Sequence, residues 1–249
     1  MFYLPKENLA LAKAEPDLAV QNWPDFFARQ HKQAQHPLLK RYYQSKVPQP
    51  NTPIGDVELL AMDMETTGLN AKVDGIVSTA VVPFTLARIQ VSQARQWLLK
   101  PRYQLTEDSI KIHRVTHSEV EHAQDITEIL PELLALLAGR VAVVHYRAIE
   151  RPFLHETLLD RLGEGVHFPL LDTMAIEAQF HRKKMSWLQR LRGSRPEVSI
   201  RLADSRRRYH LPDYRPHHAA TDAIACAELL QAQIAHHYSS RLPIGKLLL

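Results

Sequence analysis

The chain has 249 residues, of which 45% are hydrophobic and 23% are charged, and its formal net charge is +4. This composition can bury a full core and suits one domain with an appendage. The single cysteine, Cys226, excludes an internal disulfide, so we expect a core thiol in a cytoplasmic protein. Neither a membrane span nor a secretory signal is expected, because no apolar run reaches 18 residues and the N-terminus lacks a basic start before an apolar block.

The first 47 residues differ from the rest. They are rich in Ala, Leu, Lys and Gln and contain the aromatic cluster Trp23, Phe26 and Phe27, which predicts a helical N-terminal extension. Residues 48–57 are interpreted as a linker, because their prolines cannot continue a helix. The extension either packs on the core or is offered to a partner, and the sequence leaves both possibilities open.

The remaining chain alternates between strand-like and helix-like patterns. Apolar or alternating runs predict strands at 58–65, 76–86, 88–99 and 141–145, and helical patterns cover 131–138, 152–162, 171–180 and 219–236. Early antiparallel strands followed by alternating helices and strands favour an α/β fold, with a mixed sheet flanked by helices. The main domain is placed at 58–238, with 239–249 as a tail.

Two acidic residues stand at the polar end of the first of these strands. Side chains of a strand alternate between its faces, so Asp63 and Glu65 point to the same side. Two carboxylates held this close repel each other unless a cation lies between them, and Mg²⁺ or Mn²⁺ is the usual choice. The simpler alternative is an ordinary strand end with solvated acids. The adjoining Thr66-Thr67-Gly68 sequence is typical of a tight turn.

Two further segments carry residues of the same chemistry. His217 and Asp222 come at the start of the apolar helix predicted near the C-terminus, and Glu150 lies after the buried strand at 141–145.

Taken in chain order, the three segments resemble the DEDDh group of 3′–5′ exonucleases, which includes the proofreading subunit of bacterial DNA polymerase III. The resemblance covers roughly residues 58–237. The first motif (Asp63-x-Glu65-x-Thr67-Gly68) and the third (His217-x-Ala219-x-x-Asp222) match fully. The middle motif departs, because Glu150 stands where the family usually has Asp and Tyr146 where it usually has Asn or His. The landmarks Ile112-His113 and Leu171-Asp172-Thr173 also agree.

The resemblance implies a ribonuclease H-like fold and a two-metal mechanism of phosphodiester hydrolysis. It assigns four carboxylates to two divalent cations, Mg²⁺ or Mn²⁺, namely Asp63, Glu65, Asp222 and Glu150. It makes His217 the general base, since a histidine has a pKa near neutrality. The alternative for Glu150 is an exposed acid that is favourable at a helix start.

Other residues are candidates for contact with the substrate. Thr66, Thr67 and Leu69 either line a nucleotide site or only form a turn, and His113 either lies near the terminal nucleotide or is structural. Ten Lys or Arg residues against two acids between 181 and 208, including Arg206, Arg207 and Arg208, are typical of phosphate contacts or of a solvated surface. The expected partner is nucleic acid with a free 3′ end, with DNA favoured over RNA or oligoribonucleotides. A polymerase or DNA-repair partner could bind the N-terminal extension.

Three other classes of protein share parts of this pattern. His217 and His218 beside His210 would suggest zinc, but no quartet has zinc-like spacing and His218 is expected to face solvent. Aspartyl phosphatases also begin with two acids at the end of a strand, but the longer Glu65 does not suit their proton relay. A non-catalytic module that binds nucleic acid or a polymerase would not need all of these acids.

Overall fold

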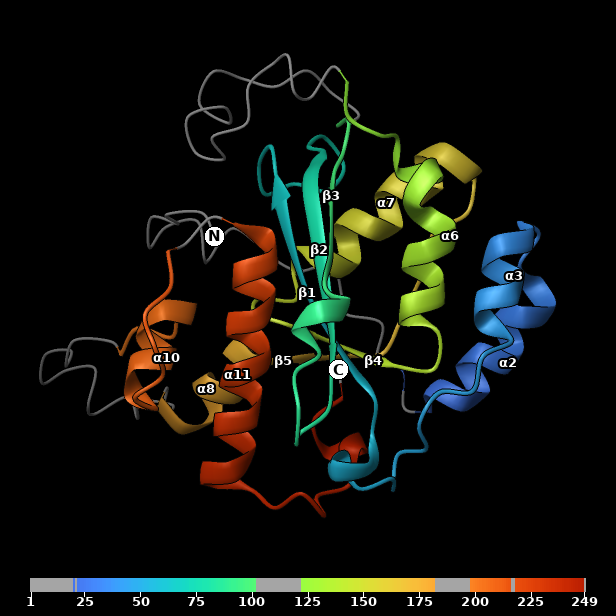
Figure 1. Ribbon diagram of the computed structural model, residues 1–249. Coiled ribbons are helices and arrows are strands. Elements are labelled where there is room, and N and C mark those ends of the chain that lie inside the picture. The colour runs from blue at the N-terminus through green and yellow to red at the C-terminus, as the bar shows by residue number, and fades with distance from the viewer. Residues whose placement is uncertain (1–19, 21, 102–121, 182–197, 216–217, 249) are drawn as a thin grey trace, which may run out of the picture.

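The computed structural model describes residues 20, 22–101, 122–181, 198–215 and 218–248. A mixed five-stranded sheet, in the order β3-β2-β1-β4-β5, forms the central layer between two layers of helices (Figure 1). Its strands are β1 (Leu59–Thr66), β2 (Ile76–Phe84), β3 (Arg95–Leu98), β4 (Val141–Val144) and β5 (Leu170–Asp172). Strand β1 pairs with β2 antiparallel and with β4 parallel, so the predicted mixed sheet is confirmed.

The alternation of β1 decides which residues meet each helical layer. Leu60 and Met62 belong to the core cluster that contains residues of four helices: α2 (Trp23–Gln33), α3 (Pro37–Tyr43), α6 (Ile126–Leu137) and α7 (Glu150–Leu162). Leu59 and Ala61 belong to the cluster that contains residues of α11 (Ala219–His237). Asp63 therefore continues the face that is turned toward α11, because it has the same parity as Leu59 and Ala61.

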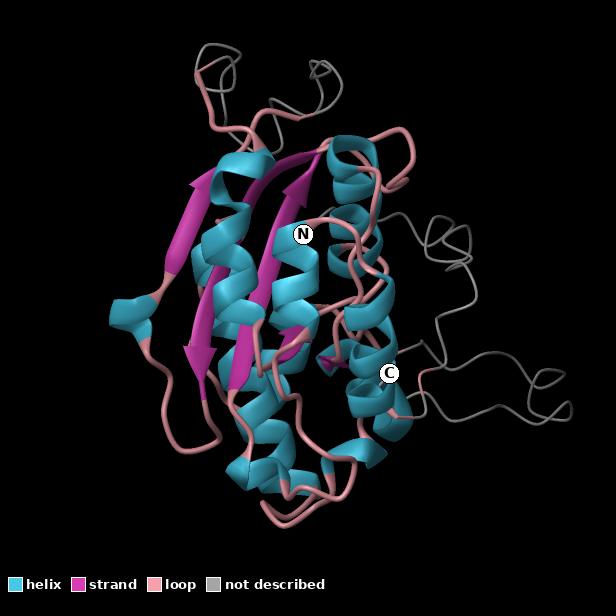
Figure 2. Cartoon of the chain, turned by 90° about the vertical axis from the view of Figure 1, so that its right-hand side faces the viewer, coloured by secondary structure: helices cyan, strands magenta, loops and turns pink. Residues whose placement is uncertain are grey.

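The helices divide between the two sides of the sheet. Those on one side are α2 (Trp23–Gln33), α3 (Pro37–Tyr43), α6 (Ile126–Leu137) and α7 (Glu150–Leu162), and those on the other are α8 (Thr173–His181), α10 (Leu202–Arg208) and α11 (Ala219–His237) (Figures 1 and 2). Within the described ranges, no helix is long and apolar enough to cross a membrane.

The described part of the N-terminal extension packs on the core. Trp23, Phe26 and Phe27 are all buried, and they share one cluster with the apolar residues of α6 and α7. Asn22 caps α2 by accepting a hydrogen bond from the backbone N–H of Asp25 at 3.2 Å. The aromatic face of α2 is therefore used inside the protein, and binding of a partner by another part of the extension stays a prediction.

The predicted linker and tail run together. The N–H of Ile54, in η1 (Ile54–Asp56), donates to the carbonyl of Leu242 at 2.9 Å. The N–H of Ile244, in η3 (Ile244–Lys246), donates to the carbonyl of Thr52 at the same distance. These backbone bonds tie the entry of β1 to the segment after α11.

Three of the predicted elements are corrected by the structure. The strand predicted at 88–99 is reduced to β3, because η2 (Val91–Gln93) interrupts the alternating run. The helix predicted from 131 begins at Ile126, because Asp125 and Glu128 form a capping box and the helix continues through Pro131. The helix predicted at 171–180 is preceded by β5, a strand of three residues that is too short to show a period.

A buried histidine ties β4 to two segments beyond it. The Nδ1 of His145 lies 2.8 Å from the hydroxyl of Thr173, and its Nε2 lies 3.1 Å from the carbonyl oxygen of Ile200. Burial is the main cause that lowers the pKa of His145 to about 4. The pKa of His167 is likewise lowered to about 4, first by burial and then by the charge of His155.

These two histidines predict acid sensitivity with a definite sign. An unfolded histidine titrates near pH 6.5, so between about pH 6.5 and pH 4 the unfolded state binds more protons than the folded state. We therefore expect stability to fall as the pH drops through this window and to be unaffected by these groups above it. Between pH 7.5 and pH 5, His145→Gln should make the decrease in the free energy of unfolding smaller by about 2 kcal/mol, as measured by urea unfolding. The contribution of His167 to that decrease should remain. An identical pH dependence in the wild type and the variant would contradict this.

Candidate active site

Three carboxylates converge on one side of the sheet. One oxygen each of Asp63, Glu65 and Asp222 can be chosen such that all lie within 4.8 Å of one another. The two strand residues come from the face of β1 that is turned toward α11, and Asp222 comes from the first turn of α11. The predicted alternation of β1 and the predicted approach of Asp222 therefore place these acids in one cluster.

The cluster is electrostatically strained without a cation. Burial raises the pKa of Asp63 well above its ordinary value, and the charges of Glu65 and Asp222 raise it further. The Oδ2 atom of Asp63 is buried and accepts no hydrogen bond from the described residues. Buried carboxylate oxygens that repel one another are the donor set that a hard divalent cation prefers.

Glu150 is the fourth acid near this point, although it is not one of the three that converge. It is the first residue of α7 and is only 3% exposed, so the alternative of an exposed acid is wrong. Burial raises the pKa of Glu150 well above its ordinary value, and the charge of Asp63 is the next cause. Its buried Oε2 accepts no hydrogen bond within the described part of the chain. Glu150 therefore shares the electrostatic environment of Asp63, as expected from its place in the middle motif.

The loop that carries Glu150 is held by a carboxylate whose role the sequence did not predict beyond a family landmark. Asp172, at the end of β5, accepts hydrogen bonds from the backbone N–H groups of Tyr146 and Arg147, both at 3.1 Å. It also accepts one from the N–H of Met174 at 2.8 Å. Tyr146 has a φ of 96°, which few residues other than glycine adopt. Asp172 thus fixes the strained loop between β4 and α7. The sequence around Asp172 does not indicate this role, because the backbone N–H groups that it binds in the loop lie far away along the chain.

The turn after β1 is closed by its own side chains. The hydroxyl of Thr66 donates to the carbonyl of Gly68 at 2.6 Å, and the N–H of Thr67 donates to the carbonyl of Gly75 at 2.9 Å. A Cβ at Gly68 would overlap the carboxylate of Asp74, so a side chain here would displace that carboxylate from the N–H of Asn70. These groups of Thr66 and Thr67 are therefore used within the turn, and their contact with a nucleotide stays a prediction. Leu69 is half-buried beside them.

Arg206 is a correction to the predicted phosphate-binding run. Its guanidinium donates to the carbonyls of Ala225 and Pro212 at 2.7 and 2.8 Å and to the carboxylate of Glu228 at 2.7 Å. Arg206 is 3% exposed and lies over the ring of Tyr214. The prediction that it contacts phosphate is wrong, because this side chain joins α10 to α11 inside the protein.

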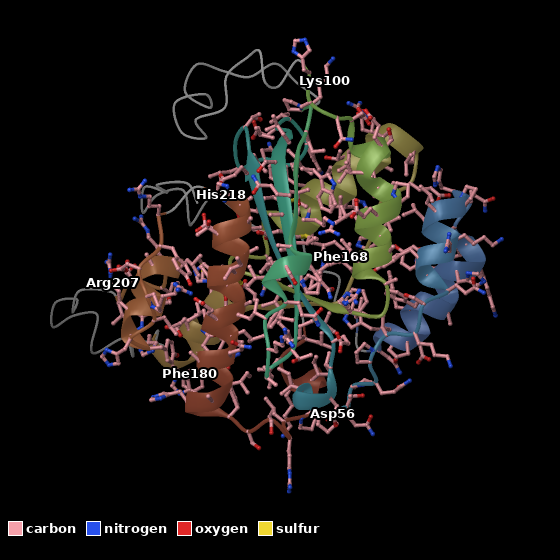
Figure 3. The ribbon with its side chains drawn as sticks, in the orientation of Figure 1. Asp56, Lys100, Phe168, Phe180, Arg207 and His218 are labelled. Atoms are coloured by element: carbon pink, nitrogen blue, oxygen red, sulfur yellow. The ribbon has the colours of Figure 1, made fainter. Side chains whose placement is uncertain are left out.

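The two neighbouring arginines differ from Arg206 and from each other. Arg208 donates to the buried carboxylate of Glu177 at 2.6 Å and to the carbonyl of Ser199 at 2.7 Å. Arg207 is exposed on the outer side of α10, and its bonds to Asp204 and Asp213 are surface ion pairs (Figure 3). Of the three, Arg207 is the most open to a phosphate, and that contact stays a prediction.

Some predicted residues lie outside the described ranges. These include His113, His217 and the segment 182–197, which holds most of the predicted basic run. His218 precedes α11 and is exposed, which confirms that it faces solvent (Figure 3). Over the residues that the structure describes, the acidic triad is the one group of three or more His, Cys, Asp or Glu placed to hold a metal, so no zinc-type cluster appears there. Cys226 is buried in the core, as predicted.

Comparison with protein families and with curated sequences places the chain among exonucleases. The model of the RNase_T exonuclease family matches residues 60–230. The chain is 26% identical to the DNA polymerase III subunit epsilon of Treponema pallidum over 73% of its own length and 78% of that protein. It is 30% identical to the PolC-type DNA polymerase III of Thermotoga maritima over 49% of its own length, but this match spans 9% of that polymerase.

Two solved structures have the same fold. Exonuclease X in complex with 5′-overhanging duplex DNA superposes with a TM-score of 0.55 and 19% identity, covering 74% of this chain and 96% of that one. The nuclease domain of 3′hExo, a DEDDh family member bound to rAMP, gives a TM-score of 0.58 and 16% identity, covering 72% of this chain and 92% of that one. The family match spans most of the sheet and all four acids described above. The chain therefore belongs to the DEDDh-type 3′–5′ exonuclease family.

Proposed function

We propose that this protein is a divalent-metal-dependent exonuclease that removes nucleoside 5′-monophosphates from the 3′ end of a DNA strand. The observation that carries this proposal is the cluster of Asp63, Glu65 and Asp222, with Glu150 near it, where burial and then the charge of Asp63 raise the pKa of Glu150. Buried like charges oppose folding, so a protein that does not use them would be more stable without them. This argues against a non-catalytic binding module.

The residues present fit two divalent cations. Four carboxylates supply the hard oxygen donors and the negative charge, and the buried Oδ2 of Asp63 and Oε2 of Glu150 accept no hydrogen bond from the residues that the structure describes. Asp63, Glu65 and Asp222 would hold the ions directly, with Glu150 as the fourth ligand. When bound, the ions would stabilise the charge that develops on the phosphate oxygens during in-line displacement.

The remaining chemistry falls to His217 and the surrounding surface. The oxygen of water forms a bond to the terminal phosphorus while the bond from phosphorus to the 3′ oxygen breaks. We assign the proton of that water to the imidazole of His217, on the basis of the family motif and of the ordinary pKa of histidine. The leaving 3′ oxygen then takes a proton from solvent.

The choice of DNA as substrate rests on the curated relatives, which are a subunit or a part of DNA polymerase III. RNA is the alternative within the same chemistry, because a solved neighbour carries rAMP. A polymerase partner is part of the proposal. Such a partner would need a surface other than the aromatic face of α2, because Trp23 and Phe27 are buried in the core.

The direct test uses three oligonucleotides that carry a label at the 5′ end: single-stranded DNA, duplex DNA and single-stranded RNA. With Mg²⁺ or Mn²⁺ we expect stepwise shortening from the 3′ end and release of nucleoside 5′-monophosphates, with DNA degraded faster than RNA. Excess chelator should stop the reaction, and added metal should restore it. Activity that persists in chelator, or early loss of the 5′ label, would refute the proposed chemistry.

Replacing Asp63 with Asn should abolish turnover and stabilise the metal-free protein. Because the pKa of Asp63 is raised in the folded state, wild-type stability decreases as the pH rises above the ordinary carboxyl pKa. The gain in Tm from Asp63→Asn should therefore be largest at neutral pH and vanish near pH 4.

The matched control for this variant is Asp56→Asn. Asp56 is exposed at the opposite end of the sheet, so this change should alter neither turnover nor Tm (Figure 3). Added Mn²⁺ should raise the Tm of the wild type but not that of Asp63→Asn. More than about a tenth of wild-type turnover in Asp63→Asn would show that Asp63 is not an essential ligand.

Replacing Glu150 with Gln should lower turnover by at least about tenfold, because it removes the charge at nearly constant shape. Glu150→Asp should be milder, because it keeps the charge with a shorter reach. Asp160→Asn, on the exposed side of the same helix, serves as the control. Turnover of Glu150→Gln within about twofold of wild type would remove Glu150 from the metal site.

A further inference from the structure

The residue after Glu150 is buried against the N-terminal extension. Arg151 is 6% exposed, and its guanidinium carbon lies 5.4 Å from the ring centroid of Trp23, the first residue of α2. The same guanidinium donates to the carbonyl of Phe168 at 3.0 Å and lies 6.0 Å from the ring of Phe168. The start of α7 is thus held between an aromatic residue of α2 and the segment that leads into β5.

That segment is itself held by the extension at further points. The carboxylate of Glu164 accepts hydrogen bonds from the backbone N–H groups of Gln35 and His36 at 2.6 and 3.1 Å. The hydroxyl of Tyr43, at the end of α3, accepts one from the N–H of His167 at 2.9 Å. The extension therefore contacts Arg151 directly through Trp23, and it also holds the segment that carries Phe168, the other partner of Arg151.

The start of α7 needs such support for a local reason. Its N-cap residue, Ile149, makes no side-chain capping bond, so an ordinary anchor of a helix start is missing here. The first helical residue, Glu150, is buried near Asp63, whose charge raises the pKa of Glu150. Repulsion between these carboxylates pushes the helix start away from the site, and Arg151 is placed to resist that displacement.

We propose that the α2–α3 extension is a positioning element for Glu150, and that it acts through the contact of Trp23 with Arg151. This inference rests on the proposed role of Glu150 at the metal site. Neither Trp23 nor Arg151 is assigned a contact with metal or substrate. Both fix the first turn of α7, and a displacement of about 1 Å at a catalytic group is enough to lower a rate about a hundredfold.

The proposal is tested by Mn²⁺ binding, measured by calorimetry, together with the Mn²⁺ concentration that gives half-maximal turnover. Trp23→Leu removes the aromatic face, and Arg151→Met removes the guanidinium while keeping the length of the stem. Each should weaken Mn²⁺ binding about tenfold, the usual effect of losing a residue that orients a ligand. Trp23→Phe and Arg151→Lys keep an aromatic ring or a cation, respectively, and should restore most of the affinity.

The matched control is Leu39→Ala. Leu39 is a buried residue of α3, which packs against α6, so this change loosens the extension without removing either partner of the Trp23–Arg151 contact. It should lower the Tm but leave Mn²⁺ affinity within about twofold of wild type. Should Trp23→Leu fail to fold, Arg151→Met and Arg151→Lys give the same comparison.

A double-mutant cycle separates positioning from general destabilisation. In the Glu150→Gln background, Trp23→Leu and Arg151→Met should cause no further loss of Mn²⁺ affinity, because the group that they position is already gone. Additive losses, or unchanged affinity in both single variants of an active enzyme, would overturn this inference alone. A wild type without metal-dependent nucleotide release would overturn the proposed function, and the inference with it.

Discussion

Mutual repulsion of buried carboxylates is the constraint on which the rest of the structure depends. Burial raises the pKa of Asp63, and the neighbouring charges of Glu65 and Asp222 raise it further. The protein holds the acids together by mounting them on different rigid elements, a central strand and a long helix. Strand β1 pairs on both sides, with β2 and β4, so the backbone of Asp63 cannot move away from the other acids. The stability of the sheet therefore opposes the strain of the site.

The same reasoning explains why the elements around the site have so many polar anchors. Asp172 accepts hydrogen bonds from four backbone N–H groups, two in the strained loop before α7 and two at the start of α8, and so fixes that loop. On the other side of the sheet, Glu177 accepts hydrogen bonds from Arg208, Tyr209 and Gln233, which joins α8, α10 and α11. The hydrogen bonds to Glu177 lower its pKa even though burial alone would raise it. Glu177 is thus a buried acid that hydrogen-bond donors stabilise, whereas Asp63 is strained by the charges beside it. This contrast distinguishes a structural carboxylate from those of the proposed metal site.

Features that depend on local periodicity could be predicted from the sequence. The alternation in β1 placed Asp63 and Glu65 on one face, and the apolar run after Asp222 marked α11 to within one residue of its end. Features that depend on distant partners could not be predicted in this way. The burial of Arg206 requires acceptors on α11, the segment of Pro212 and the ring of Tyr214, which no pattern around 206 reveals. Strand β5 exists because β4 supplies its hydrogen bonds, and three residues carry no period of their own.

Glu150 shows how a departure from a family motif can be absorbed by the fold. A glutamate reaches about one methylene further than the usual aspartate, so its carboxylate can take the same place only if the backbone that carries it lies further from the proposed metal site. Tyr146, which replaces the usual Asn or His, takes a left-handed φ and still donates its N–H to Asp172. The loop therefore keeps its anchor while its side chains change. Arg151 then sets the helix start from the opposite side, against Trp23 and Phe168. The start of α7 is therefore anchored on both sides of Glu150, by Asp172 through the preceding loop and by Arg151 against the extension.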